Sequence, residues 1–318
     1  MSDYYAAFPL YTSEQVQALK RNSIDPVSLI DLLAQTTASE DTRVLGQDIY
    51  AGLLKTSMYR QRLERGARLI DPLGIGTPAC IDLSSLPPLS FFLRADFALE
   101  TPYLSRDDRV FSVTENPVRK DRVFGLPLIA GATWKGALRN ACLLESPEAL
   151  NRLFGPQATK NLGGEESAAK QHEGRIYAFT SFFTQIATEI INPHGRVCRV
   201  GKNPIRIECV PRGARSRLVL LYLATPRDER SRTLGPAHFR NQVADDLITV
   251  ARCVQAALRN YGVSAKKSSG YGAAADMLVG ERGIIEVAVL KGGSASFTRF
   301  SELVGAAQQL ASQIRERA

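Results

Sequence analysis

The segment FFLRADFALE, residues 91–100, places an apolar side chain at every second position from Phe91 to Leu99. Arg94, Asp96 and Glu100 lie among the intervening positions, which point to the other side of an extended chain. This period of two predicts a β-strand with one buried face, the first strand of the fold.

Further helices and strands follow this strand along the chain. Trp134, Leu138 and Ala141 have helical spacing behind Thr133, a residue that favours the start of a helix. Apolar runs of strand length and a second helical period occur farther along: strands at 176–183 and 218–224, a helix at 243–262 and a weaker strand at 271–279. The order strand, helix, strand, strand, helix, strand predicts an α+β fold with a ferredoxin-like βαββαβ core, the pattern of RNA-recognition sheets.

Additional elements flank this core. Helical periods before residue 70, with Thr12 and Gln15 in a capping-box pattern, predict an N-terminal helical extension. Four prolines and two glycines between 71 and 88 favour a linker. We therefore expect three parts: the helical extension and linker at 1–88, a ferredoxin-like core at 89–280, and a C-terminal strand and amphipathic helix at 281–318.

Composition limits the class of protein. Among 318 residues, 44% are hydrophobic and 23% are charged, which excludes disorder as the main state. No apolar run is long enough for a membrane span and no signal peptide is evident, so we expect a cytoplasmic protein without a membrane partner. The cysteine spacings match no zinc or redox motif. Forty basic against thirty-two acidic residues give a net charge of +8, which favours a polyanionic partner.

Positive charge is concentrated between Gly195 and Arg217, where seven basic residues occur with one acid, Glu208. This density predicts a basic hairpin that contacts a polyanion. The residues expected to make that contact are Arg196, Arg199, Lys202 and Arg206.

Two glycine-rich segments combine close backbone approach with cations. In GLPLIAGATWKGALR (125–139), a turn meets a helix start whose free N–H groups favour phosphate, near Lys135, Gly136 and Arg139. The second segment, AKKSSGYG (265–272), joins cations, glycines and a base-stacking aromatic: Lys266, Lys267, Gly270, Tyr271 and Gly272. An ordinary loop-to-helix turn and a charged hairpin turn are the alternative interpretations.

The order of these motifs, with LFG at 153–155 and GRI at 174–176 between them, resembles the RAMP superfamily of CRISPR proteins. The resemblance covers roughly residues 89–280 and is most specific in the first glycine-rich segment. It implies a modified ferredoxin-like fold that binds guide RNA as one subunit of a larger effector.

The segment TENPVRKD (114–121) is similar to a loop of backbone subunits in type III effectors, where the usual pattern is Asp-x-Pro-[VI]-x-[RK]-[DE]. The resemblance implies that the leading acid serves cleavage of target RNA. Here that position is Glu115, and Arg119 and Lys120 are expected to contact phosphate. Asp107 and Asp108 are weaker candidates for the same acid. A carboxylate can promote attack by a ribose 2′-OH as a base or through a divalent ion such as magnesium; we expect no tightly bound cofactor.

The resulting hypothesis is a guide-RNA-binding subunit of a type III CRISPR ribonucleoprotein. Its expected partners are guide RNA, complementary target RNA and other effector subunits. Three alternatives stay open: a metal-dependent endoribonuclease that uses Glu115, a non-catalytic capping subunit, and a repeat-processing endoribonuclease. The histidines that the last would need (His172, His194 and His238) are scattered along the chain.

Overall fold

The computed structural model describes residues 11–21, 24–107, 112–156, 172–192, 204–288 and 293–316. The chain forms two compact units, each assembled from segments that are separated in the sequence. Unit 1 comprises Met1–Leu69, Leu104–Pro127 and Phe183–Pro211. Unit 2 comprises Ile70–Tyr103, Leu128–Phe182 and Arg212–Ala318.

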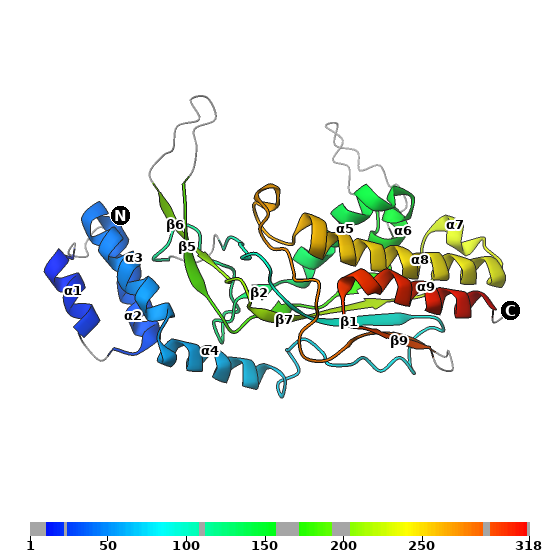
Figure 1. Cartoon of the computed structure of the whole chain (residues 1–318), viewed down its shortest axis with the longest axis horizontal. Helices are drawn as coiled ribbons and strands as arrows, with labels where there is room; N and C mark the ends of the chain where they lie inside the picture. Colours follow the sequence, from blue (N-terminus) through cyan, green and yellow to red (C-terminus); the bar gives the residue numbers. More distant parts are fainter. Residues whose placement is uncertain are drawn as a thin grey trace, which may run out of the picture. The chain divides into compact units, whose positions relative to one another are not determined.

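A five-stranded antiparallel sheet forms the centre of unit 2, in the order β3-β7-β1-β8-β9. Its strands are β1 (Phe91–Ala98), β3 (Ile176–Ala178), β7 (Arg215–Tyr222), β8 (Gly283–Val287) and β9 (Ser294–Phe297). Strands β7, β1 and β9 are labelled in Figure 1. The first strand lies between the third and the fourth strand of the core, which is the split arrangement of a ferredoxin-like fold. The predicted fold class and the strand at 91–100 are therefore confirmed.

The fourth strand of the core is β8, and the predicted strand at 271–279 is wrong. Residues 271–279 form no strand: their β-pairing is limited to isolated bridges, Leu99 with Ala274 and Met277 with Arg299, beside single backbone hydrogen bonds. Gly272 and Gly280 have φ values of +78° and +75°, which interrupt an extended strand at both ends of this segment. The run at 176–183 is also divided, into β3 and β4 (Ser181–Phe182), and β4 pairs with β2 (Leu128–Ile129).

The long helices among the described residues of unit 2 are α5 (Gly131–Glu145), α8 (Pro236–Ala256) and α9 (Phe300–Glu316). Figure 1 shows α8 and α9 side by side above the sheet, and α5 also packs against α8. Trp134 of α5 is fully buried and meets Phe97 of β1 edge to face at 5.9 Å between ring centroids. The shorter elements are η3 (Pro147–Ala149), α6 (Leu150–Phe154), α7 (Glu229–Arg232), the π-helical turn η4 (Ala257–Tyr261) and η5 (Lys267–Ser269).

A buried charge network joins the sheet of unit 2 to its helices. Arg175, fully buried, donates to Asp246 and to the Tyr222 hydroxyl, each at 3.0 Å. Asp246 also accepts hydrogen bonds from Arg152 and Tyr222. The second guanidinium nitrogen of Arg175 donates to Ser231 at 2.7 Å. Because every charge in the network faces an opposite charge, the group is compatible with burial.

Unit 1 contains the predicted N-terminal helices and a hairpin. The helices are α1 (Ser13–Arg21), α2 (Pro26–Gln35), η2 (Thr36–Ala38), α3 (Glu40–Leu54) and α4 (Ser57–Ile70). The capping box precedes α1: the Thr12 amide donates to Gln15 Oε1 and the Gln15 amide donates to Thr12 Oγ1. Strands β5 (Ala187–Ile191) and β6 (Ile205–Cys209) pair antiparallel. No helix in the described part of the chain is long and apolar enough to cross a membrane.

Candidate nucleic-acid interface

The first glycine-rich segment places the start of α5 directly against β3. A Cβ on Gly131 would overlap the Ala178 carbonyl oxygen, so only glycine allows the helix to begin here. The helix starts before Thr133, and its N-cap is Ala130, which offers no side-chain hydrogen bond. The predicted cap at Thr133 is wrong because the first turn begins two residues earlier.

Lys135, Gly136 and Arg139 follow along α5 in different environments. Lys135 is half-buried, and Gly136 is exposed with no atom within 4 Å of an added Cβ. Arg139 is half-buried and donates through Nη1 to the Gly155 carbonyl oxygen at 2.7 Å. Its Nη2 is buried and has no hydrogen-bond partner among the described residues. Arg139 therefore connects α5 to the turn after α6, while the surface over Gly136 is open.

The LFG and GRI motifs lie next to each other in the structure, and backbone conformation and close packing explain why each contains a glycine. Gly155 has a φ of +83°, which favours glycine, and ends α6. A Cβ on Gly174 would overlap the backbone of Leu153 and Phe154. These two motifs therefore build the close contact between α6 and the start of β3.

The late glycine turn leaves the end of α8 and folds back on itself. The Val263 amide donates to the Gly272 carbonyl at 3.0 Å, and the Gly272 amide donates to the Pro102 carbonyl at 2.8 Å. A Cβ on Gly272 would overlap Ser264. At the tip, Lys266, Lys267 and Gly270 are exposed, whereas Tyr271 is half-buried. The turn thus holds two ammonium groups in solvent on a docked backbone.

The 114–121 loop belongs to unit 1 and carries Glu115 on its surface. The Glu115 carboxylate is 49% exposed and lies 3.7 Å from Nη1 of Arg43 on α3. The Arg119 amide donates to Ser105 Oγ at 2.8 Å, and the Asp107 amide donates to the Pro117 carbonyl at 3.1 Å. Asp107 therefore lies alongside this loop, while Asp108 lies outside the described residues.

A buried carboxylate, Glu208 of β6, anchors the loop. It is 1% exposed and accepts hydrogen bonds from the Val118 amide at 3.0 Å, from Lys120 Nζ at 2.6 Å and from the Tyr50 hydroxyl at 2.6 Å. Burial, together with the Glu208 charge, raises the pKa of Tyr50 well above its ordinary value, so that the hydroxyl stays protonated and donates. Lys120, expected at phosphate, is thus paired inside the protein.

The sequence contained a signal for this anchor. Glu208 is the one acid among seven basic residues between Gly195 and Arg217. Charged residues are almost never fully buried unless they are paired, and the nearby cations offer Glu208 such partners. Tyr50 and Arg43, by contrast, carried no recognisable signal in the helical extension.

The basic hairpin is described only at its base. Arg206 of β6 is paired with Asp48 of α3 at 2.6 Å. Arg196, Arg199 and Lys202 lie outside the described residues. Their assignment to RNA stays a prediction.

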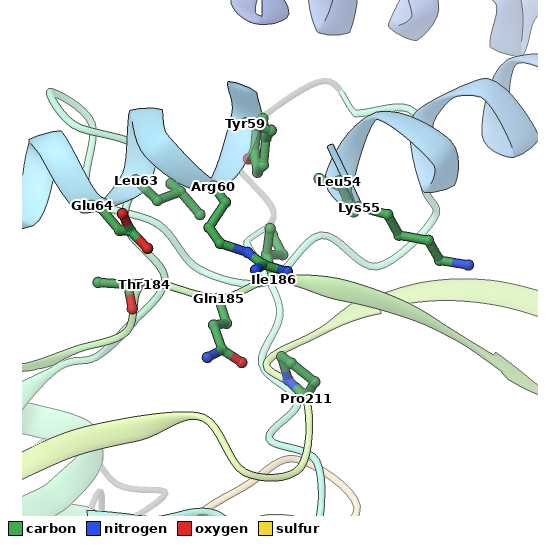
Figure 2. Close-up of a pocket in the computed structure, with 10 residues that line it drawn as sticks. All are labelled: Leu54, Lys55, Tyr59, Arg60, Leu63, Glu64, Thr184, Gln185, Ile186 and Pro211. Atoms are coloured by element: carbon green, nitrogen blue, oxygen red, sulfur yellow. The ribbon is translucent and has the colours of Figure 1, made fainter. Parts of the chain in front are cut away.

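A cavity of about 390 Å³ opens elsewhere in unit 1, between α4 and the ends of β5 and β6 (Figure 2). Its lining includes the buried side chains Leu63 of α4 and Ile186, and Figure 2 shows Arg60 extending from α4 toward Ile186. None of the predicted site residues lines this cavity. Among the described residues, no group of three or more histidine, cysteine or acidic side chains could hold a metal ion.

Comparisons with known proteins were made by sequence and by structure. A search of curated proteins by sequence gives no match. Many chains of solved structures are similar to this one, among them three with low sequence identity. One, in the cryo-EM structure of the type III-B Cmr-beta bound to cognate target RNA, has 13% identity and a TM-score of 0.47, covering 86% of this chain and 96% of its own. Another, in the crystal structure of the Csm3-Csm4 subcomplex in the type III-A CRISPR-Cas interference complex, has 13% identity, a TM-score of 0.40 and coverage of 70% and 96%.

The third, in a CRISPR RNA-guided surveillance complex, has 14% identity, a TM-score of 0.38 and coverage of 62% and 68%. The sequence match is more decisive. The family model of the RAMP superfamily matches residues 67–275, which include both glycine-rich segments and the 114–121 loop. The chain therefore belongs to the RAMP superfamily.

Proposed function

We propose that this chain is a guide-RNA-binding subunit of a type III CRISPR ribonucleoprotein in the cytoplasm. It holds guide RNA and complementary target RNA together with other effector subunits. The observation that carries the proposal is the open surface at Gly136, beside Lys135, within the residues that match the RAMP superfamily. A glycine inside a helix weakens the helix unless it permits a close approach. The chain itself does not fill that space, which leaves room for a ligand.

The available cations suit the phosphate backbone of RNA. Lys135 lies on α5, and Lys266 and Lys267 lie beyond the end of α8. The Tyr261 hydroxyl at that end donates to Glu145 at the C-terminus of α5. Lys135 and Glu145 are ten residues apart, or about 15 Å along a helix. The cations are therefore distributed along one helix and the turn near its end, as sequence-tolerant contacts to successive phosphates require.

Salt dependence of RNA binding tests this function. We expect the assembled complex to bind RNA tightly and with little sequence preference, and to lose on the order of a thousandfold in affinity between about 50 and 200 mM salt. Replacing both Lys266 and Lys267 by alanine should lower the slope of log K against log salt by about two, with no change in the thermal melt. A salt-independent affinity, or no RNA bound by the complex, would contradict the proposal.

Cleavage of target RNA at Glu115 is a second proposed activity, supported by an exposed carboxylate on an anchored loop. Magnesium in phosphoryl-transfer sites is commonly held by one or two carboxylates together with substrate phosphate, so a single glutamate suits a cation that arrives with RNA. In this mechanism the 2′-OH attacks phosphorus, its proton goes to Glu115, the bond to the 5′ oxygen breaks, and that oxygen takes a proton from water. The products are a 2′,3′-cyclic phosphate and a 5′-hydroxyl.

Variants of Glu115 separate a cleaving subunit from a non-catalytic one. We expect weak, divalent-ion-dependent cleavage that Glu115→Ala abolishes and Glu115→Asp keeps or raises, because the charge is retained in both acids. Cleavage that persists in Glu115→Ala would move the assignment to Asp107 and Asp108. Absence of cleavage in the natural protein and in Glu115→Asp would favour a non-catalytic capping subunit.

A repeat-processing endoribonuclease has less support. His172 is half-buried, and its ring nitrogen lies 3.2 Å from the adjacent Glu173 carbonyl oxygen. His238 lies in the first turn of α8. Neither histidine has a nearby carboxylate partner among the described interactions, which general acid-base chemistry would favour.

A further inference from the structure

One stripe of α3 faces the 114–121 loop. Arg43, Gln47 and Tyr50 are spaced i, i+4 and i+7, so they lie on the same side of the helix. All three precede residue 67, where the match to the RAMP superfamily begins. The stripe is therefore a property of this chain's own N-terminal helices.

Each residue of the stripe meets the loop or its anchor. Gln47 Nε2 donates to the Val113 carbonyl at 3.2 Å, just before the loop. The Tyr50 hydroxyl donates a hydrogen bond to Glu208, which also accepts a hydrogen bond from the Val118 amide. These contacts fix both sides of Glu115, because they hold the backbone before and after it. Arg43 is the third member and lies beside the Glu115 side chain.

The contact between Arg43 and Glu115 is loose compared with the anchor below it. The nitrogen-oxygen distance is 3.7 Å, whereas charge-assisted hydrogen bonds have distances of about 2.8 Å. Arg43 also faces Glu40 at 3.3 Å, and the exposed fractions are 36% for Arg43 and 77% for Glu40. Solvent-exposed ion pairs of this kind contribute little to stability. The guanidinium is thus held near Glu115 but can exchange its partners for a ligand.

We propose that Arg43 binds a phosphate of the target RNA beside Glu115, an inference that rests on the proposed RNA-binding function. A guanidinium presents paired N–H donors that match two phosphate oxygens, and it keeps its charge at any physiological pH. The buried contacts of Gln47 and Tyr50 place it at a fixed distance from the loop. With RNA bound, Arg43 pairs with phosphate and leaves the Glu115 carboxylate facing the ribose. The N-terminal helices are then part of the target-RNA site.

The test measures binding of complementary RNA to the guide-loaded complex, with a chelator present so that no divalent-ion-dependent cleavage occurs. We expect Arg43→Ala to weaken binding on the order of tenfold and to lower the salt slope by about one. Guide retention and the thermal melt should stay unchanged. Arg43→Gln removes the charge but keeps the length and a donor, and it should show the same loss of slope if the alanine variant folds poorly. Arg65→Ala, which removes an exposed arginine from α4, is the matched control and should change neither quantity.

The outcomes separate this proposal from the proposed function. If the natural complex binds complementary RNA and Arg43→Gln binds it with the same affinity and slope, the assignment of Arg43 is wrong and the function stands. An equal loss in Arg65→Ala would also overturn it, because the effect would then reflect total charge. If the natural complex binds no RNA at all, the proposed function fails and the role of Arg43 fails with it.

Discussion

Arg175 in unit 2 and Glu208 in unit 1 are both buried ions, but Arg175 bonds to residues of the packed core, whereas Glu208 bonds to a surface loop. Arg175 connects β3, β7 and the helices through Asp246, Tyr222 and Ser231, which are all parts of the packed framework. Glu208 connects β6 and Tyr50 of α3 to the backbone of an exposed loop. The first network joins the sheet and the helices of unit 2, and the second joins the 114–121 loop to β6 and α3 of unit 1.

This difference shows how one kind of interaction serves two purposes. A buried charge that is paired with an opposite charge is costly to disturb, so the groups bonded to it stay in one geometry. In unit 2 the fixed geometry is the fold. In unit 1 the fixed geometry is the position of Glu115, which lies three residues before Val118, whose amide donates a hydrogen bond to Glu208. Disruption of the Arg175 network should therefore lower mainly the free energy of unfolding, and disruption of the Glu208 network should be detected mainly by hydrogen exchange in the loop.

The largest effect is expected at Asp246. Asp246→Ala leaves Arg175 and Arg152 without their shared carboxylate in the interior, which should lower the free energy of unfolding by about 3–5 kcal/mol. The neighbouring Asp245→Ala removes only an exposed pair with Arg315 and should cost less than about 1 kcal/mol. Denaturant titration of both variants checks the difference. Equal costs would mean that the buried network has no special role.

A smaller loss of stability, with a larger local effect, is expected at Glu208. Glu208→Gln removes the charge opposite Lys120 and should cost about 1–3 kcal/mol. The Val118 amide loses its carboxylate acceptor, so its hydrogen exchange should become about tenfold faster than in the natural protein. Asp48→Asn is the control, because it weakens an exposed link between the same helix and strand. Unchanged exchange at Val118 in Glu208→Gln would contradict the anchoring role.

The smallest changes in stability are expected for the two cations of α5, Arg139 and Lys135. Arg139→Ala removes the hydrogen bond to Gly155 and should destabilise the protein by about 1 kcal/mol. Lys135→Ala should change stability by less than about 0.5 kcal/mol and should reduce guide-RNA affinity. Thermal melts beside RNA titrations distinguish them. If Lys135→Ala is the more destabilising of the two, the assignment of Lys135 to phosphate loses its basis.

The fold could be predicted from the sequence wherever the signal was periodic and local. The alternation in 91–100 and the helical period around Trp134 report burial of one face, and both elements are present as β1 and α5. The strand expected at 271–279 failed because two glycines with positive φ interrupt it. A short apolar segment alone does not say whether its backbone will pair in a sheet, and β8 takes the place in the sheet instead.

The candidate site could be predicted only in part. The glycine-rich segments and the loop with Glu115 were visible as motifs, since such motifs are continuous in the sequence. The sequence did not show which cations are paired with other groups of the protein. Lys120, Arg139 and Arg206 were expected at RNA, but each has a partner within the protein. Whether a cation is paired depends on what the fold brings beside it.

The sequence by itself determined the α+β class and the N-terminal helices, and it predicted a basic surface directed to RNA. These features depend on composition and on spacings of two to four residues, which local geometry converts directly into strands and helices. The tertiary structure alone decided that Glu208 is buried, that Tyr50 lies against it and that Arg43 lies beside Glu115. Tyr50 and Glu208 are 158 residues apart in the chain, and no local rule relates residues at that separation. Only packing brings them together, because a buried carboxylate requires donors from wherever the fold can supply them.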